Sequence, residues 1–193
     1  MIDAAPPGAR RKRTVPGCAV FFTGLSASGK STIAAAVHGQ LAALSDRPVT
    51  VLDGDVVRRT VSPGLGYSKT DRDQNVLRVG TMAADITRSG GIVLCAVIAP
   101  YDAARQAVRR MIEPVGGFVL VYVSTPLDVC EARDPKGLYA KARAGVIDHF
   151  TGISDPYEPP ASADVVIDTT RLTVAQAADA VLQRLHTWFE VGA

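Results

Sequence analysis

The sequence lacks the features that mark a membrane protein or a secreted, disulfide-bonded domain. Among its 193 residues, no apolar run approaches the ~20 residues that a membrane-spanning helix needs. Residues 1–16 contain prolines and charges but no apolar signal-peptide core. The three cysteines, Cys18, Cys95 and Cys130, are far apart and lack the spacing of metal ligands. We therefore expect no membrane association and a reducing, cytoplasmic setting.

An excess of one charge sign is also missing. The chain has 21 Lys and Arg against 19 Asp and Glu, so its net charge is +2 and we expect no nucleic-acid partner. The one strongly basic run is Arg-Arg-Lys-Arg at residues 10–13. Such a run is either a solvated tail or a binding patch, and a solvated tail is the more common case.

Apolar runs and helical patterns alternate after a short leader. We expect residues 1–16 to be a flexible leader or linker and residues 17–193 to form one domain. Strands are expected at residues 18–23, 49–52, 92–98, 118–123 and 165–167. Helices are expected at residues 30–44, 71–89, 102–112 and 173–189, with another beginning at Pro126. This alternation predicts an α/β fold in which helices cover both faces of a parallel sheet of about five strands.

A phosphate-binding motif connects the first expected strand to the first expected helix. Residues 24–31, GLSASGKS, fit the pattern G-x-x-x-x-G-K-S/T in the strand–turn–helix context that the motif requires. In such a loop the backbone N–H groups cradle phosphates, Lys30 reaches the β- and γ-phosphates of ATP, and the Ser31 hydroxyl ligates Mg²⁺. The expected ATP-binding residues are Gly24, Leu25, Ser26, Ala27, Ser28, Gly29, Lys30, Ser31 and Thr32. The motif predicts a P-loop, nucleoside-kinase-like fold; a glycine-rich turn with a surface lysine is the simpler alternative.

Two aspartates follow the second expected strand, at the edge of the sheet where ligands bind. Asp55 is our candidate to orient or deprotonate an acceptor hydroxyl, and it could also contact a Mg²⁺-bound water. Asp53 is expected to fix the loop. Both residues could instead be turn and cap residues, an alternative that the neighbouring phosphate loop weakens.

Several segments, in order along the chain, resemble adenylylsulfate kinase, which phosphorylates the 3′-hydroxyl of adenosine 5′-phosphosulfate. The matching segments are GLSASGKST (24–32), LDGDVVR (52–58), LGYSKTDRDQN (65–75), IAPYDAAR (98–105), CEARDPKGLYAKARAG (130–145) and FTGISDPYEPP (150–160). Any P-loop kinase could carry the first segment, but the combination is highly specific. The resemblance implies a phosphotransferase of sulfate assimilation that uses ATP with Mg²⁺ and acts as a homodimer.

The resemblance also implies a role for each matching residue. On the ATP side, Arg133 would stack near the adenine. On the substrate side, Asp55 would meet the acceptor hydroxyl, Arg58 would bind phosphosulfate or ribose, and Arg72 and Asn75 would contact the phosphosulfate. Tyr67 and Phe150 would sandwich the substrate adenine, and the pocket would be lined by Ile98, Ala99, Pro100 and Tyr101. A closing lid segment, about residues 134–152, would contain Lys136, Gly137, Leu138 and Tyr139.

These assignments have simpler alternatives. Tyr67 and Phe150 could be core aromatic residues. Arg58 and Arg72 could form surface ion pairs, and Lys136 could be solvated on its loop. Electrostatics supports the functional roles, because a dianionic substrate beside ATP concentrates negative charge that arginine can neutralise with bidentate contacts.

Ala99 departs from the family pattern. The family commonly has serine in an I-S-P-Y stretch, where it has been assigned as a phosphoserine intermediate, and this chain has alanine there. Ala99 has no hydroxyl, so either the protein is inactive or the phosphoryl group passes directly from ATP to the substrate, which we favour. The segment IAPYDA and residues 116–134 are most similar to kinase domains fused behind a sulfate adenylyltransferase, so we also consider such an enzyme as a partner or fusion.

Two other functions stay open at the level of sequence. One is a P-loop kinase of another small alcohol or nucleotide, which the set Arg58, Arg72, Asn75 and Phe150 disfavours. The other is a non-catalytic, nucleotide-binding regulatory module. Ala99 favours that module, whereas Lys30 and Asp55 disfavour it.

Overall fold

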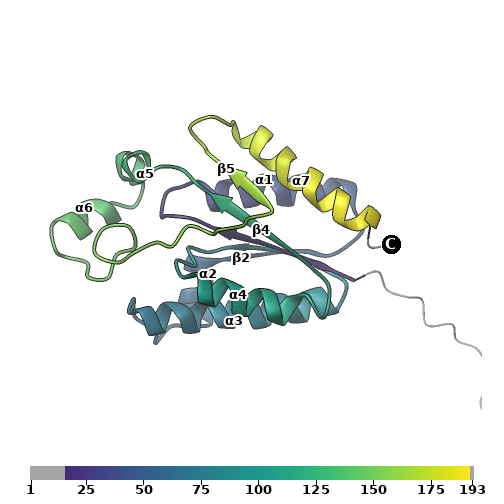
Figure 1. Cartoon of the computed structure of the whole chain (residues 1–193), viewed down its shortest axis with the longest axis horizontal. Helices are drawn as coiled ribbons and strands as arrows, with labels where there is room; N and C mark the ends of the chain where they lie inside the picture. Colours follow the sequence, from purple (N-terminus) through teal and green to yellow (C-terminus); the bar gives the residue numbers. More distant parts are fainter. Residues whose placement is uncertain (1–15, 192–193) are drawn as a thin grey trace, which may run out of the picture.

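The architecture is a five-stranded parallel sheet between layers of helices. The computed structural model describes residues 16–191 (Figure 1). The strands are β1 (Cys18–Thr23), β2 (Val49–Asp53), β3 (Ile92–Ala96), β4 (Gly117–Val123) and β5 (Val165–Ile167), in the order β2-β3-β1-β4-β5. All neighbouring strands are parallel. The predicted α/β class is confirmed, and the central strand β1 leads directly into the glycine-rich loop.

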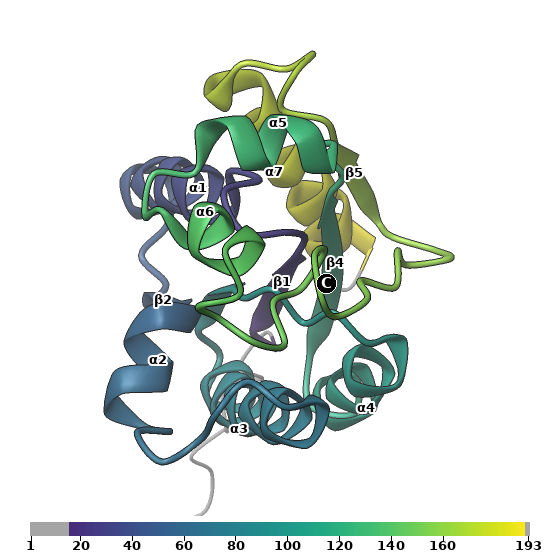
Figure 2. The same cartoon turned by 90° about the vertical axis from the view of Figure 1, so that its left-hand side faces the viewer.

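Helices cover both faces of this sheet. One face carries α1 (Lys30–Leu44) and α7 (Val174–Val191), and the other carries α3 (Lys69–Arg88) and α4 (Asp102–Ile112) (Figure 1). Three short helices gather at the carboxyl ends of the strands: α2 (Gly54–Thr60), α5 (Leu127–Arg133) and α6 (Leu138–Arg143). Figure 2 looks onto this end of the sheet, with α5 and α6 in front. Ligands of parallel α/β folds bind at this end.

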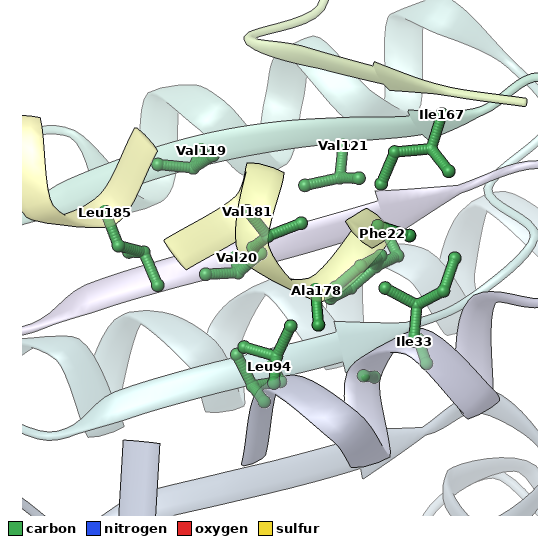
Figure 3. Close-up of a cluster of buried hydrophobic side chains, with 14 of the residues drawn as sticks. Val20, Phe22, Ile33, Leu94, Val119, Val121, Ile167, Ala178, Val181 and Leu185 are labelled. Atoms are coloured by element: carbon green, nitrogen blue, oxygen red, sulfur yellow. The ribbon is translucent and has the colours of Figure 1, made fainter. Parts of the chain in front are cut away.

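Two hydrophobic cores join the layers, because successive residues of a strand point to opposite faces. On β1, Cys18, Val20 and Phe22 pack toward α1 and α7, while Ala19 and Phe21 pack toward α3 and α4. Figure 3 shows the first core, in which strand residues meet Ile33 of α1 and the α7 residues Ala178, Val181 and Leu185. Burial on both faces explains why the strands are nearly continuous apolar runs.

Side-chain caps decide where the two longest helices begin. Ser68 Oγ accepts a hydrogen bond from the Asp71 N–H at 3.2 Å, so α3 begins at Lys69, two residues before its predicted start. Thr173 and Gln176 form a capping box. The Gln176 N–H donates to Thr173 Oγ1 at 3.2 Å, and the Thr173 N–H donates to Gln176 Oε1 at 3.0 Å. These contacts start α7 at the following residue.

Besides the earlier start of α3, the structure departs from the predicted elements at the end of β3 and at two short helices. The strand prediction is wrong at residues 97–98, because the Ile98 carbonyl leaves the ladder and accepts from the Thr23 hydroxyl at 2.7 Å. The short helices α2 and α6 were not predicted, since six or seven residues show no clear helical period. The basic run at residues 10–13 and nearly all of the expected leader lie outside the described residues. Within residues 16–191, no helix has the length and apolarity that crossing a bilayer requires.

Candidate active site

The glycine-rich loop between β1 and α1 has the backbone geometry of an anion-binding loop. Gly24 has φ +147° and Gly29 has φ +108°, conformations that side chains disfavour. A Cβ atom at Gly24 would also lie 2.5 Å from the carbonyl oxygen of Val123. Ala27 adopts φ +58° although it carries a Cβ. These turns place Lys30 at the beginning of α1, where free N–H groups and the helix dipole favour an anionic ligand.

Lys30 is held inside this loop. It is 7% exposed, and its Nζ donates to the Leu25 carbonyl and, at 3.3 Å, to Ser28 Oγ. Burial lowers the pKa of the Lys30 ammonium group to about 8, because the charged form loses its water. Its two hydrogen-bond acceptors are neutral. A triphosphate would therefore supply the negative charge that these acceptors lack.

Asp53 and Asp55 stand where β2 passes into α2. Asp53 caps the helix, since its Oδ1 accepts from the Asp55 N–H at 3.0 Å, and its Oδ2 accepts from the Ser31 hydroxyl at 2.7 Å. Asp53 therefore fixes the loop, as the sequence predicts, and also reaches the phosphate loop. The Asp55 carboxylate is 58% exposed and forms an ion pair with Lys136.

A cavity of about 240 Å³ opens between the phosphate loop, the start of α2 and the segment after β3. It collects most of the predicted site residues: Ser26, Ala27, Lys30, Ser31, Asp55, Arg58, Tyr67, Arg72, Asn75, Ile98, Ala99, Pro100, Lys136, Leu138 and Phe150. Its volume is below the ~300 Å³ at which ligand pockets usually begin. The exposed ion pair of Asp55 and Lys136 forms part of its wall.

Other predicted site residues lie outside the cavity wall. Of the described residues, those that do not line it include Gly24, Leu25, Ser28, Gly29, Thr32, Tyr101, Arg133 and Gly137. The Gly24 N–H donates to the carbonyl of Ile98 in the wall at 3.3 Å, and Thr32 is exposed on α1. Tyr101 is 4% exposed, with Lys69 Nζ 4.3 Å from its ring centroid, so it packs behind the wall.

Two arginines share the ring of Tyr67. Their guanidinium carbons lie 4.6 Å (Arg58) and 5.5 Å (Arg72) from the ring centroid. Tyr67 is 53% exposed, so it is no core aromatic, and Arg72 is 5% exposed, so it is no surface ion pair. Burial is the main cause that lowers the pKa of Arg72, and the positive charge of Arg58 is the second cause. Two adjacent cations of this kind favour an anionic ligand.

The segment around α6 has a small core of its own. The rings of Tyr139 and Phe150 pack edge to face with centroids 4.9 Å apart, and Cys130 lies in the same cluster. The Tyr139 hydroxyl donates to the carbonyl of Ser26 at 3.0 Å, which joins this segment to the phosphate loop. Phe150 is 8% exposed and still lines the cavity, so its core and site roles coexist.

Two threonines that sequence reasoning missed support the phosphate loop. Thr169 Oγ1 donates to the Ser28 carbonyl at 3.2 Å, and Thr125 Oγ1 donates to the same carbonyl at 3.0 Å. Arg133 lies on this side, where its guanidinium donates to Thr169 Oγ1 at 2.7 Å. The sequence offered one signal for these threonines, which is their position: Thr125 and Thr169 follow the carboxyl ends of β4 and β5, where ligands bind.

Two buried polar atoms in the cavity wall have no hydrogen-bond partner among residues 16–191. They are Asn75 Oδ1 and Thr151 Oγ1, on residues that are 5% and 2% exposed. Buried polar groups are nearly always satisfied, so a ligand or a water in the cavity would bond these two atoms. Thr151 was not predicted, although it directly follows Phe150.

The donor set beside the phosphate loop consists of hard oxygen ligands. Within the described part of the chain, no cluster of three or more His, Cys, Asp or Glu side chains could hold a metal. The oxygens of Ser31, Asp53 and Asp55 nevertheless lie close to the loop. Mg²⁺ usually takes one or two protein oxygens together with phosphate oxygens and water. The residues therefore fit Mg²⁺ that arrives with a nucleotide and do not fit a metal held by protein alone.

Known proteins resemble this chain over most of its length. The family model described as adenylylsulphate kinase matches residues 16–168. The adenylyl-sulfate kinase of Synechococcus sp. (strain JA-2-3B'a(2-13)) is 53% identical over 171 residues, which cover 89% of this chain and 95% of that protein. The sulfate adenylyltransferase of Neurospora crassa is 43% identical over 175 residues, which cover 91% of this chain but 30% of that protein.

A solved structure agrees with the whole fold. The Mycobacterium tuberculosis APS kinase CysC in complex with AMPPNP and APS is 40% identical and superposes with a TM-score of 0.85. The match covers 89% of this chain and 98% of that one.

Proposed function

The chain belongs to the adenylylsulfate kinase family, and we propose that it passes the phosphoryl group directly from ATP to its substrate, without a phosphorylated enzyme intermediate. It is an ATP-dependent kinase of adenosine 5′-phosphosulfate (APS) and produces 3′-phosphoadenosine 5′-phosphosulfate in sulfate assimilation. The direct route concerns how the γ-phosphate of ATP reaches the 3′-hydroxyl of APS.

Ala99 carries the proposal of direct transfer. It stands in the cavity wall and is 2% exposed, and its methyl group cannot accept a phosphoryl group. Lys30 and Asp55 line the same cavity, which supports a meeting of donor and acceptor without a relay residue. Phosphoryl transfer in line needs positioning and charge neutralisation more than covalent chemistry.

Lys30 and Asp55 take the two central roles. Lys30 and the backbone N–H groups of the phosphate loop hold the β- and γ-phosphates. Asp55 faces the 3′-hydroxyl of APS, orients it and accepts its proton as the oxygen attacks the γ-phosphorus. Asp55 is paired with Lys136, so binding of APS exchanges that contact. The ammonium group of Lys136, released from Asp55, then neutralises negative charge on the phosphoryl group during its transfer.

The remaining wall binds APS. Arg58 and Arg72 bind the phosphosulfate, which the close pair of cations beside Tyr67 supports. Asn75 lies on the same side: its amide NH₂ can donate to the phosphosulfate, and its unpartnered amide oxygen accepts from a donor of APS such as a ribose hydroxyl. The adenine lies between Tyr67 and Phe150, against the wall formed by Ile98, Ala99 and Pro100, with Tyr101 behind it. Flat apolar faces with a few polar groups are typical of such pockets.

ATP binds on the other side of the phosphate loop. Arg133 stacks near its adenine, next to Thr169. Residues 134–152, with Lys136, Gly137, Leu138 and Tyr139, act as a lid that excludes water and prevents ATP hydrolysis. The Ser31 hydroxyl would hold Mg²⁺ that enters with ATP, and the carboxylates of Asp53 and Asp55 lie in the same cavity wall. When bound, the ion neutralises phosphate charge.

We also propose a homodimer in a reducing cytoplasm, and a fusion or partnership with a sulfate adenylyltransferase. The three buried free cysteines support the reducing cytoplasm. The fusion or partnership is supported by the match to 30% of the Neurospora crassa sulfate adenylyltransferase. Analytical ultracentrifugation at several concentrations tests the dimer. A single species with the mass of one chain, 20.3 kDa, would refute it.

Radiolabelled ATP tests direct transfer. Protein incubated with [γ-³²P]ATP and Mg²⁺, without APS, should carry no acid-stable label, and it should label APS when APS is added. The Ala99→Ser variant restores the hydroxyl and serves as the matched control. Label bound to the unmodified protein in amounts near one per chain, and chased into APS, would refute the direct route.

The substrate is tested separately by coupled detection of ADP with a panel of acceptors. APS should be turned over far faster than AMP, which lacks only the sulfo group, or a simple alcohol. Equal turnover of AMP would contradict the role of Arg58 and Arg72 in phosphosulfate binding.

A further inference from the structure

Arg105 is a buried cation that the reaction described above leaves unused. It lies on α4, is 1% exposed, and does not line the cavity. A buried charge is costly unless its hydrogen bonds are well arranged. Within residues 16–191, its carboxylate partner is Asp102, at 3.1 Å, and its Nε bonds to nothing. Its remaining bonds go to backbone carbonyls, so Arg105 mainly orders the backbone.

The two backbone acceptors belong to separate parts of the site. Nη1 of Arg105 donates to the Ala99 carbonyl at 2.8 Å, and Nη2 donates to the Glu158 carbonyl at 2.7 Å. Ala99 is part of the cavity wall, and its φ of +42° is a conformation that surrounding contacts must hold. Glu158 is the last residue of the segment 150–158, which we call the return from Phe150. Its N–H donates to the Pro100 carbonyl at 2.9 Å. One guanidinium thus joins the wall to the segment that carries Phe150.

Thr23 holds the same peptide from the phosphate-loop side. Its hydroxyl bonds to the carbonyls of Ile98 (2.7 Å) and Ala99 (3.1 Å), and it lies 2.9 Å from the Tyr157 hydroxyl. Thr23 is the residue before the phosphate loop. The end of β1, the APS-binding wall and the return from Phe150 therefore meet at the carbonyl of Ala99, which Arg105 and Thr23 both bind.

We propose that Arg105 is a positioning residue for APS. It holds the Ala99 peptide in its left-handed conformation and sets the distance between the wall at Ile98–Pro100 and the side of the pocket at Phe150. The proposal rests on the APS kinase function given above. Because Arg105 has no contact with the phosphate loop itself, its loss affects binding and phosphorylation of APS and leaves ATP binding intact.

The first test replaces Arg105 with lysine. Lysine keeps the charge, but its single ammonium nitrogen replaces two guanidinium nitrogens. It therefore cannot reproduce the planar fork with which Arg105 holds the two carbonyls. We expect kcat/KM for APS to fall at least about tenfold with a higher KM for APS, since small misplacements near a reacting centre cost this much. The Kd for ATP, measured by calorimetry, should stay within about twofold of the unmodified protein.

Arg109→Lys is the matched control. It lies one helical turn further on α4, pairs with Asp164 at 3.3 Å and Glu113 at 3.1 Å, and does not line the cavity. Its kcat/KM for APS should equal that of the unmodified protein. Equal kinetics for Arg105→Lys and Arg109→Lys would overturn the proposal, whereas absence of APS turnover in the unmodified protein would instead refute the function.

Rescue by glycine separates positioning from a merely structural role. Glycine adopts a left-handed backbone without the Cβ penalty. Adding Ala99→Gly to Arg105→Lys should recover kcat/KM at least about threefold, with Ala99→Gly alone measured to complete the cycle. No recovery would overturn the proposal. If Arg105→Lys does not fold, Tyr157→Phe removes the hydroxyl beside Thr23, and an unchanged KM for APS would overturn it as well.

Discussion

The buried ammonium group of Lys30 should make ATP binding weaken with rising pH in a range where ATP itself does not titrate. Burial lowers the pKa of Lys30 to about 8. A bound triphosphate favours the charged form, so the pKa rises in the complex. Between these two values the complex holds more protons than the free protein. ATP binding therefore takes up a proton, and affinity falls as pH rises through 8.

The size of the effect follows from the fraction of charged lysine. With a pKa of about 8, about nine tenths of the free protein carries the charge at pH 7 and about one tenth at pH 9. The Kd for ATP should increase about tenfold between these pH values, which corresponds to about 1.4 kcal/mol. The second ionisation of a phosphate group lies near pH 6, so it changes little over this range.

Isothermal titration calorimetry with ATP and Mg²⁺, without APS, measures this change. Repeating it in buffers of different ionisation enthalpy counts the proton taken up near pH 8.5. Lys30→Arg is the matched control, because a guanidinium stays charged to far higher pH; its affinity is lower but should vary little from pH 7 to pH 9. A Kd of the unmodified protein that is constant from pH 7 to pH 9 would refute the reasoning.

Three further predictions concern the reacting carboxylate, its ion-pair partner and the core. Asp55→Ala should lower kcat at least about 10²-fold in the coupled ADP assay, with the Kd for ATP nearly kept; a kcat close to normal would contradict the role of Asp55. Lys136→Ala should lower kcat but leave the Tm nearly unchanged, because the two partners are 57% and 58% exposed and such pairs contribute little stability. Leu185→Ala should lower the free energy of unfolding in urea by about 2–5 kcal/mol, since Leu185 is 1% exposed in the core under α7; a loss below that range would show that α7 repacks.

The fold and the phosphate site were predictable because their signals are local. The run Cys18–Thr23 is buried on both faces, and a strand of that kind must be apolar throughout. Gly24, Gly29 and Lys30 are fixed by what a loop around a phosphate requires at each position. Asp55 could be placed at the ligand-binding edge because all strands of a parallel sheet end at the same edge, although β3 lies between β2 and β1.

The rest depends on contacts between distant segments, which no local pattern records. Arg105 looks like an ordinary helix residue until its acceptors at Ala99 and Glu158, far apart in sequence, are seen together. Thr169 follows a three-residue strand and carries no motif. The early end of β3 is equally non-local, because the hydroxyl of Thr23 takes the Ile98 carbonyl out of the ladder.

The order of the core along the chain has a consequence for biosynthesis. Cys18, Val20 and Phe22 belong to β1, the first of the described strands to be synthesised, yet they pack against α7, which begins only at Val174. The part of this face that α7 covers therefore stays open until α7 is synthesised, while α1 can already pack on the same face. This core is completed only after α7 leaves the exit tunnel, and until then its uncovered apolar residues expose the nascent chain to aggregation.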